Sequence, residues 1–219
     1  MIIFAKYNIN NCEIPVQTHR KHLGVVIDQK LSFNEYIDYV YNKSVKKWSY
    51  INRLCSYASP NVLLMLYKTY MYILPIIEYN NTCLTLNLTQ NKKIESIQRS
   101  ITKQICHKMN LNEYNYTQRL EALNISSLEC RRNVRTLKIL FKCIHDFNGV
   151  PNHWKDFYSI LRNDRNGRII DKPKTRNNFC DKNFFIHSIQ LFNSLPIDIR
   201  NENNLNLFLT KCQHFYNNF

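Results

Sequence analysis

The spacing of apolar residues changes along the chain, from the alternation typical of strands to the period typical of helices. Ile2 to Phe4 and His22 to Asp28 are rich in β-branched and aromatic residues, so they predict two short strands on either side of a polar turn region, 8–15. From Asn34 onward, apolar residues recur at steps of three and four, which places them on one face of a helix. These residues are Ile37, Val40, Tyr41, Val45, Trp48, Ile51 and Cys55. Three lysines fall largely off this apolar face: Lys43, Lys46 and Lys47.

The next apolar run, 62–77, is predicted to be a buried core helix. Ser59-Pro60 marks its start, because proline in the first turn lacks an N–H that would have no helical partner. The run is shorter than the roughly 20 apolar residues that a bilayer requires, carries Lys68 at its middle and is interrupted by Pro75. A membrane span is therefore not expected here.

Two longer helices are predicted downstream. The first spans 91–109, where an apolar stripe is formed by Ile94, Ile97, Ile101 and Ile105. The second begins at a capping box formed by Ser126 and Glu129 and runs to about Phe147. Its inward residues are predicted to be Leu137, Leu140, Phe141 and Ile144, whereas five cations are expected to stay solvated: Arg131, Arg132, Arg135, Lys138 and Lys142.

The C-terminal third is less regular. The stretch 157–178 is charged and poor in apolar residues, so it is predicted to be a mobile loop. Residues 184–196 are apolar again and are expected to pack back onto the protein, before a last helix over 204–215. The chain is thus predicted to be mainly α, with a β element at 1–33, a helical domain at 34–149 and a C-terminal region at 150–219.

Composition adds a strongly basic character. The formal net charge is +14, and the segment from Gln90 to Arg176 contributes +10 of it. Such a positive field attracts polyanions, nucleic acid among them, but charge alone does not identify the partner. Membranes and acidic proteins also respond to positive charge, and a merely soluble basic surface remains an alternative. Only three glycines are present, which argues against a β-sandwich or a phosphate-cradling loop.

The eight cysteines do not form a recognisable metal or disulfide pattern. No C-x-x-C pair occurs, and tetrahedral zinc sites usually need two ligands that are brought together by a short turn. The first residues, Met1 to Ala5, are too short an apolar run for a signal peptide, and Lys6 interrupts them. We therefore expect an intracellular protein, nuclear or cytoplasmic and not secreted, whose thiols are reduced.

Several short blocks occur in a fixed order along nearly the whole chain. They are His22 to Asp28 with Leu31 to Phe33, Leu74-Pro75 with Ile77 to Tyr79, Ile94 to Arg99, Arg119-Leu120 through Arg131-Arg132, and Phe184-Phe185 with Asn193 to Pro196. In this order they resemble the C-terminal part of the reverse transcriptase of non-LTR (LINE-type, jockey-like) retrotransposons. Phe192 stands where that family often has tryptophan, and His187 where it often has arginine.

The resemblance implies a helical thumb-like bundle that follows a β-hairpin remnant of the palm. Leu23 and Gly24 would lie at the primer grip, although an ordinary turn glycine in a small sheet explains the same residues. Thumb contacts should be mainly to phosphates, because a polymerase must hold any sequence. The candidates for these contacts are Lys92, Lys93, Arg99, Lys103, Arg131, Arg132 and Arg135, and a solvated helix face is the alternative for each.

The resemblance also implies a missing part. Polymerases of this family need a pair of adjacent aspartates that hold Mg²⁺, and no such pair occurs in the chain. The metal would belong to a palm supplied by an upstream palm and fingers polypeptide, and this chain alone is predicted to be inactive as an RNA-directed DNA polymerase. A free-standing basic RNA- or DNA-binding module and a protein-interaction module with a basic face are the alternatives.

Overall fold

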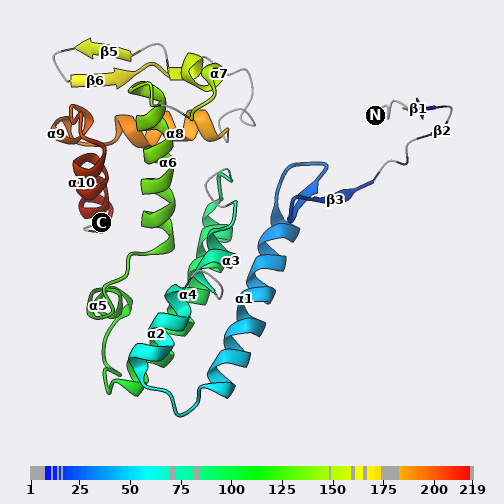
Figure 1. Ribbon diagram of the computed structural model, residues 1–219, viewed down its shortest axis with the longest axis vertical. Helices are drawn as coiled ribbons and strands as arrows, with labels where there is room; N and C mark the ends of the chain where they lie inside the picture. The colour runs from blue at the N-terminus through cyan, green and yellow to red at the C-terminus, as the bar shows by residue number, and fades with distance from the viewer. Residues whose placement is uncertain are drawn as a thin grey trace.

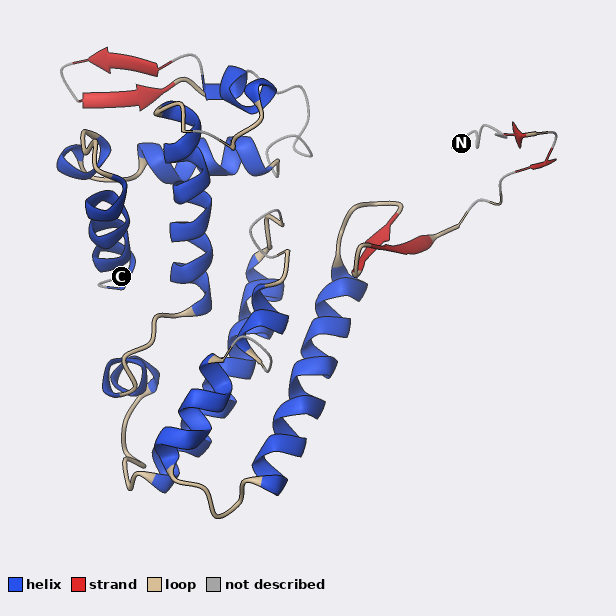
Figure 2. Ribbon diagram, in the orientation of Figure 1, coloured by secondary structure: helices blue, strands red, loops and turns tan. Residues whose placement is uncertain are grey.

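The computed structural model describes residues 8–10, 12–13, 15, 17–69, 73–80, 84–147, 149–158, 161–164, 167–173 and 183–217, and this part of the chain is mainly helical, as predicted (Figures 1 and 2). Its helices are α1 Asn34–Leu54, α2 Pro60–Lys68, α3 Leu74–Glu78, α4 Leu88–Lys108, α5 Tyr116–Ala122, α6 Leu128–Ile144, α7 Asn152–Lys155, α8 Phe184–Asn193, α9 Ile197–Arg200 and α10 Leu205–Asn217, with a 3₁₀ turn, η1, at Asp156–Tyr158. Its strands are β1 Asn8–Ile9, β2 Cys12–Glu13, β3 His19–His22, β4 Val25–Asp28, β5 Leu161–Asp164 and β6 Gly167–Ile170. They pair as three antiparallel hairpins, β1–β2, β3–β4 and β5–β6. The predicted strand at 2–4 lies outside the described residues.

The long helices α1 and α4 lie side by side and run in the same direction. Near their starts, Gln90 Nε2 donates to Asn34 Oδ1 at 2.7 Å. Near their ends, Trp48 Nε1 donates to Gln104 Oε1 at 2.9 Å. All four isoleucines predicted for the stripe of α4 are at most 2% exposed. In α1 the predicted inward Val45 is 38% exposed, so the apolar face of α1 is narrower than the sequence suggests.

The buried side chains form two hydrophobic clusters that meet along α6. The first extends from Val25 to Leu128 and is formed by β4, α1–α4, Leu123 after α5 and the start of α6. The second extends from Leu137 to Cys212 and is formed by α6, η1, β6 and α8–α10. Figure 1 shows α6 running from the group of α1–α5 up to the group of α8–α10. One helix therefore contributes to both clusters, while the domain boundary predicted after residue 149 stays a prediction.

The apolar run 62–77 is not one helix. Helix α2 ends at Lys68, and α3 begins at Leu74 with Pro75 in its first turn, so proline starts a new helix here. The ammonium of Lys68 donates to the carbonyls of Leu123 and Asn124 at 3.1 and 3.2 Å, which takes the charge out of the apolar run. Among the described residues, no helix combines the length and the apolarity needed to cross a bilayer.

The start of α6 also differs from the prediction. The N-cap is Ser127, whose Oγ accepts from the Cys130 N–H at 3.1 Å. Ser126 instead accepts a hydrogen bond from Gln213 of α10 at 3.1 Å, so tertiary contact decides between the two adjacent serines. The helix ends at Ile144, three residues before the predicted end.

The stretch 157–178 was predicted to be a mobile loop, which is wrong for its central part. Strands β5 and β6 form a hairpin, and Ile170 at the end of β6 is fully buried in the second cluster. The side-chain amide of Asn193 donates to the Ile170 carbonyl at 2.8 Å and accepts from its N–H at 3.1 Å. A residue of α8 thus satisfies the backbone of β6, a contact that local composition does not reveal.

Candidate nucleic-acid interface

The predicted primer-grip residues form the turn of the β3–β4 hairpin. Leu23 and Gly24 are the two loop residues, and both have positive φ, 45° and 83°, as in type I′ turns. The Tyr79 hydroxyl donates to the Leu23 carbonyl at 2.7 Å. A Cβ on Gly24 would lie 3.3 Å from Tyr79 Cε1. Glycine is therefore required for the backbone conformation and for the close approach of the turn to α3.

Three of the predicted phosphate contacts share one exposed face of α4. Lys92, Arg99 and Lys103 are separated by seven and four residues, which brings their side chains to the same side of the helix. The Arg99 guanidinium lies 4.0 Å from the centroid of the Tyr116 ring, which holds it in place. In the part of the chain that the structure describes, none of the three has a carboxylate within ion-pair distance. We call these three residues the α4 stripe.

Lys93 faces the other way and is used within the fold. Its ammonium lies 2.5 Å from the carboxylate of Asp38 and 5.4 Å from the centroid of the Tyr41 ring. It therefore ties α4 to α1, and it is less available to a ligand than the residues of the α4 stripe.

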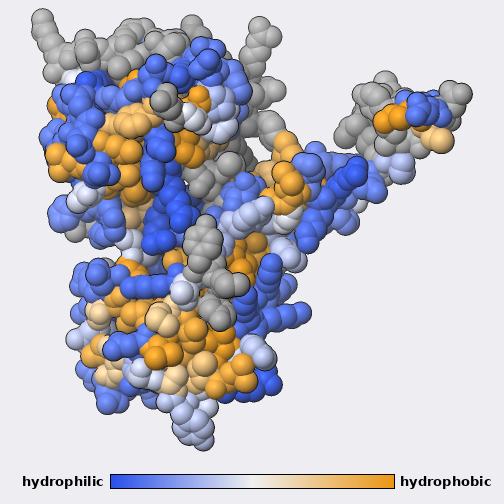
Figure 3. All heavy atoms as spheres, viewed as in Figure 1, coloured by the Kyte–Doolittle hydropathy of each residue, from blue (hydrophilic) through white to orange (hydrophobic). Residues whose placement is uncertain are grey.

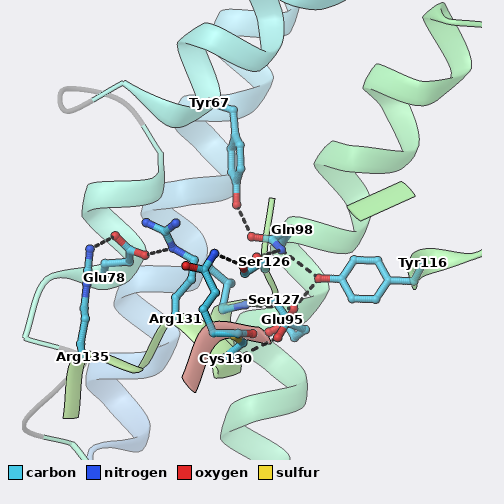
Figure 4. Close-up of polar contacts among 12 residues, drawn as sticks. Tyr67, Glu78, Glu95, Gln98, Tyr116, Ser126, Ser127, Cys130, Arg131 and Arg135 are labelled. Carbon is cyan, nitrogen blue, oxygen red and sulfur yellow. Dashed lines mark hydrogen bonds and ion pairs between the residues drawn. The ribbon is translucent and has the colours of Figure 1, made fainter. Parts of the chain in front are cut away.

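The predicted solvation is wrong for Arg132 of α6, whereas Arg131 and Arg135 stay partly exposed but are paired. Arg131 and Arg135 both form ion pairs with Glu78 of α3, the second at 2.6 Å (Figure 4). Arg132 is only 7% exposed and donates to the side chain of Asn91. Burial lowers the pKa of this guanidinium. Glu78 lies more than 50 positions before its partners, so the sequence pattern of α6 alone could not show that these cations join α6 to α3 and α4.

A chain of hydrogen bonds connects α2, α4 and α5 (Figure 4). Tyr67 donates to Gln98 Oε1 at 2.5 Å, and Gln98 Nε2 donates to the Tyr116 hydroxyl at 3.1 Å and to the Ser126 carbonyl at 3.0 Å. Tyr116 in turn donates to the carboxylate of Glu95. These bonds fix the ring on which Arg99 rests, so one cation of the stripe is positioned by buried structure.

Sequence reasoning did not identify a second basic face, on α1. It combines two exposed aromatic and three exposed cationic residues: Tyr39, Lys43, Lys46, Tyr50 and Arg53. We call these five residues the α1 face. The available signal was the lysines outside the apolar stripe, at helical spacing with two tyrosines. Aromatic and basic residues on one surface are typical of single-strand binding.

Hydrophilic and apolar residues are unevenly distributed over the surface. Figure 3 shows apolar residues gathered over α2, whereas hydrophilic and apolar residues lie side by side at the β3–β4 hairpin. In α2, Val62 and Met65 are 41% and 58% exposed. Among the described residues, no three His, Cys, Asp or Glu side chains are grouped as metal ligands would be. The chemistry available on the basic faces is the binding of anions.

Comparison with known proteins adds no relative. No protein-family model matches the sequence, no curated protein is significantly similar to it, and no solved structure matches its fold. Function is therefore argued from the residues themselves.

Proposed function

We propose that this chain holds nucleic acid through phosphate contacts, as the thumb-like part of a polymerase of the non-LTR retrotransposon type. The observation that carries the proposal is the α4 stripe, in which Lys92, Arg99 and Lys103 are exposed and have no carboxylate partner among the described residues. The proposal assigns to this chain the holding of the strand and not polymerisation.

The spacing of the α4 stripe suits a phosphate backbone. Lys92 and Lys103 are eleven residues apart, which is about 16 Å along a helix axis. One strand of a duplex advances about 3.4 Å per phosphate, so the stripe would run past about five phosphates. Contacts of this kind hold a strand without reading its sequence, as a thumb must.

The order of the sequence blocks supports the same proposal. The β3–β4 hairpin with Gly24 in its turn immediately precedes the helices, as the primer grip precedes the thumb in the family that the chain resembles. Glu78, in the block that resembles the P…EY segment, pairs with Arg131 and Arg135 in and next to the RR block. The two blocks thus support one another structurally, whereas the α4 stripe is left for a ligand.

The test is a salt titration of duplex binding with a charge-matched control. We compare Lys92→Ala/Lys103→Ala with Lys138→Ala/Lys142→Ala, which removes the same charge from α6. The first variant should reduce the slope of log K against log salt by about 2, because each lost phosphate contact removes about 0.9. The second variant should leave the slope close to that of the unmodified protein.

Two outcomes would contradict the proposal. Equal slopes for the two variants would mean that net charge alone attracts the duplex. A loss of affinity of the unmodified protein well below tenfold between about 50 and 200 mM salt would mean that few phosphates are contacted. In that case an acidic protein becomes the better partner for the basic surface.

A further inference from the structure

A hollow of about 340 Å³ lies between the β3–β4 hairpin, α1 and α3. Lys21 comes from the hairpin and Lys43 from α1, while Tyr79 follows α3 and Gly24 lies in the hairpin turn. Its volume is at the lower end of the range for small-ligand sites, so it would admit one small unit and not a duplex. We call it the hairpin hollow.

The hairpin hollow is positively charged. The ammonium groups of Lys21 and Lys43 lie 5.0 and 5.6 Å from the centroid of the Tyr39 ring, and both lysines line the hollow. Of the residues that the structure describes, no carboxylate lines the hollow. The nearby acids of α1 have other neighbours, since Glu35 lies 3.7 Å from His19 and Asp38 pairs with Lys93.

The pKa of Tyr39 also responds to the positive charge of these two lysines. The ammonium of Lys43, together with that of Lys21, lowers the pKa of the Tyr39 phenol, because positive charge favours the phenolate. Two positive charges that stabilise an added negative charge would stabilise an anionic ligand in the same way.

The wall opposite the lysines is fixed before any ligand binds. The Tyr79 hydroxyl is held by the Leu23 carbonyl, and the Tyr79 carbonyl accepts from the Tyr36 hydroxyl at 2.8 Å. The Tyr79 ring therefore cannot turn freely, and Pro75 and Ile76 extend the apolar wall beside it. A planar group could lie against this wall at little entropic cost.

We propose that the hairpin hollow binds the terminal phosphate of a nucleotide, with Lys21 and Lys43 on the phosphate and the Tyr79 side against the rest of the unit. A phosphate monoester carries a charge of about −1.5 to −2 at neutral pH, which the two ammonium groups match. A phosphodiester within a strand carries only one negative charge, so a terminal phosphate is preferred.

The α1 face indicates where a strand would continue. Lys46, Tyr50 and Arg53 follow Lys43 on the same exposed side of α1, and Tyr50 is 59% exposed. A single strand whose 5′-phosphorylated end lies in the hairpin hollow would pass cations for its phosphates and an aromatic ring for a base. The path of the strand along α1 rests on the proposed function, whereas the binding of the terminal phosphate rests on the hairpin hollow alone.

The experiment compares short single-stranded oligonucleotides that differ only in a 5′-phosphate or a 5′-hydroxyl, each labelled at the 3′ end for fluorescence anisotropy. The phosphorylated strand should bind about tenfold more tightly, as expected for one additional charge-assisted contact. Lys43→Gln and Lys21→Gln should remove this preference, because each should weaken binding of the phosphorylated strand more than binding of the 5′-hydroxyl strand. Lys138→Gln is the control and should retain the preference, and circular dichroism verifies the folding of each variant.

Competition identifies the source of the phosphate. Displacement of the phosphorylated strand by adenosine monophosphate assigns the site to free nucleotides as well, whereas displacement only by phosphorylated strands assigns it to strand ends. Equal binding of the two oligonucleotides, a preference that survives both lysine variants, or equal competition by inorganic phosphate would overturn the proposal. If neither oligonucleotide binds, the single-strand path along the α1 face is wrong, whereas the proposed function is still decided by the salt titration of duplex binding. Binding of adenosine monophosphate that depends on Lys43 would still support a phosphate site in the hairpin hollow. A lack of such binding would overturn the proposed site.

Discussion

Two features of the structure favour glycine at position 24: its positive φ and its closeness to Tyr79. Its φ of +83° disfavours any side chain, and a Cβ would also press on the Tyr79 ring. Gly149 has a similar φ of +91°, but a Cβ there would have no neighbour within 4 Å among the described residues, so it is a matched control for the backbone effect alone. We expect Gly149→Ala to reduce the free energy of unfolding by about 1 kcal/mol and Gly24→Ala by about 2 kcal/mol. Urea denaturation measures both, and equal losses would contradict the contact with Tyr79.

Glu95 is a buried carboxyl whose ionisation opposes folding. Burial raises its pKa above the ordinary value of 4.5, although the hydrogen bond from Tyr116 partly offsets this. The folded state therefore holds the proton more tightly than the unfolded state, and this contribution to stability is complete below pH 4.5 and lost as pH rises through the folded pKa.

Replacing Glu95 by glutamine removes this pH dependence. Relative to the unmodified protein, Glu95→Gln should gain stability as pH rises from 4.5 through the folded pKa of Glu95, and the gain should level off above it, because only the carboxyl must ionise. Unfolding free energies of both proteins across this range measure the difference. Glu121→Gln, at an exposed position of α5, is the control and should give a flat difference. A difference for Glu95→Gln that is flat or falls with pH would rule out the burial effect.

At the scale of elements, the start of α6 depends on one serine. Ser127 Oγ accepts from the Cys130 N–H, so Ser127→Ala should reduce the free energy of unfolding by about 1 kcal/mol, whereas Ser127→Asp should retain most of it. Thermal or urea denaturation measures these changes. If the alanine variant were as stable as the protein itself, Ser127 would not be the cap.

The helices that follow a regular apolar stripe could be predicted from the sequence. Helix α4 is predicted correctly because its isoleucines recur at the helical period, and all four are buried in the core: Ile94, Ile97, Ile101 and Ile105. Pro75 marked the interruption between α2 and α3, but the β5–β6 hairpin could not be predicted, because it depends on distant contacts such as the bonds of Asn193 to β6. Tertiary structure decided this element.

The candidate site could be predicted only where local helical spacing determines it. Lys92, Arg99 and Lys103 were found because helical spacing places them outside the core. Arg131 and Arg135 have the same spacing, but Glu78 lies opposite them, and no local pattern shows which cations meet such an acid. The hairpin hollow was missed because its two lysines are brought together by the β3–β4 turn and α1.

At the scale of the whole molecule, the two hydrophobic clusters provide two separable sources of stability. Ile101 is fully buried in the first and Leu140 in the second. Each change to alanine should cost about 2–5 kcal/mol. Leu140→Ala should reduce hydrogen-exchange protection in α8–α10 more than in α1 and α4, and Ile101→Ala should do the reverse. An equal loss of protection throughout for both variants would mean that the clusters unfold as one unit.

The position of α6 also determines the order in which the protein can be built during synthesis. The first cluster ends at Leu128, so all of its side chains have been translated when the ribosome enters α6. The second cluster begins on α6 at Leu137, but its other walls, α8–α10, extend to Asn217. Because chains fold from the N-terminus as they emerge, a nascent protein would carry a finished first cluster and an α6 whose apolar side faces water. The interval between translation of Ile144 and of α10 is therefore when the growing chain most needs protection from aggregation.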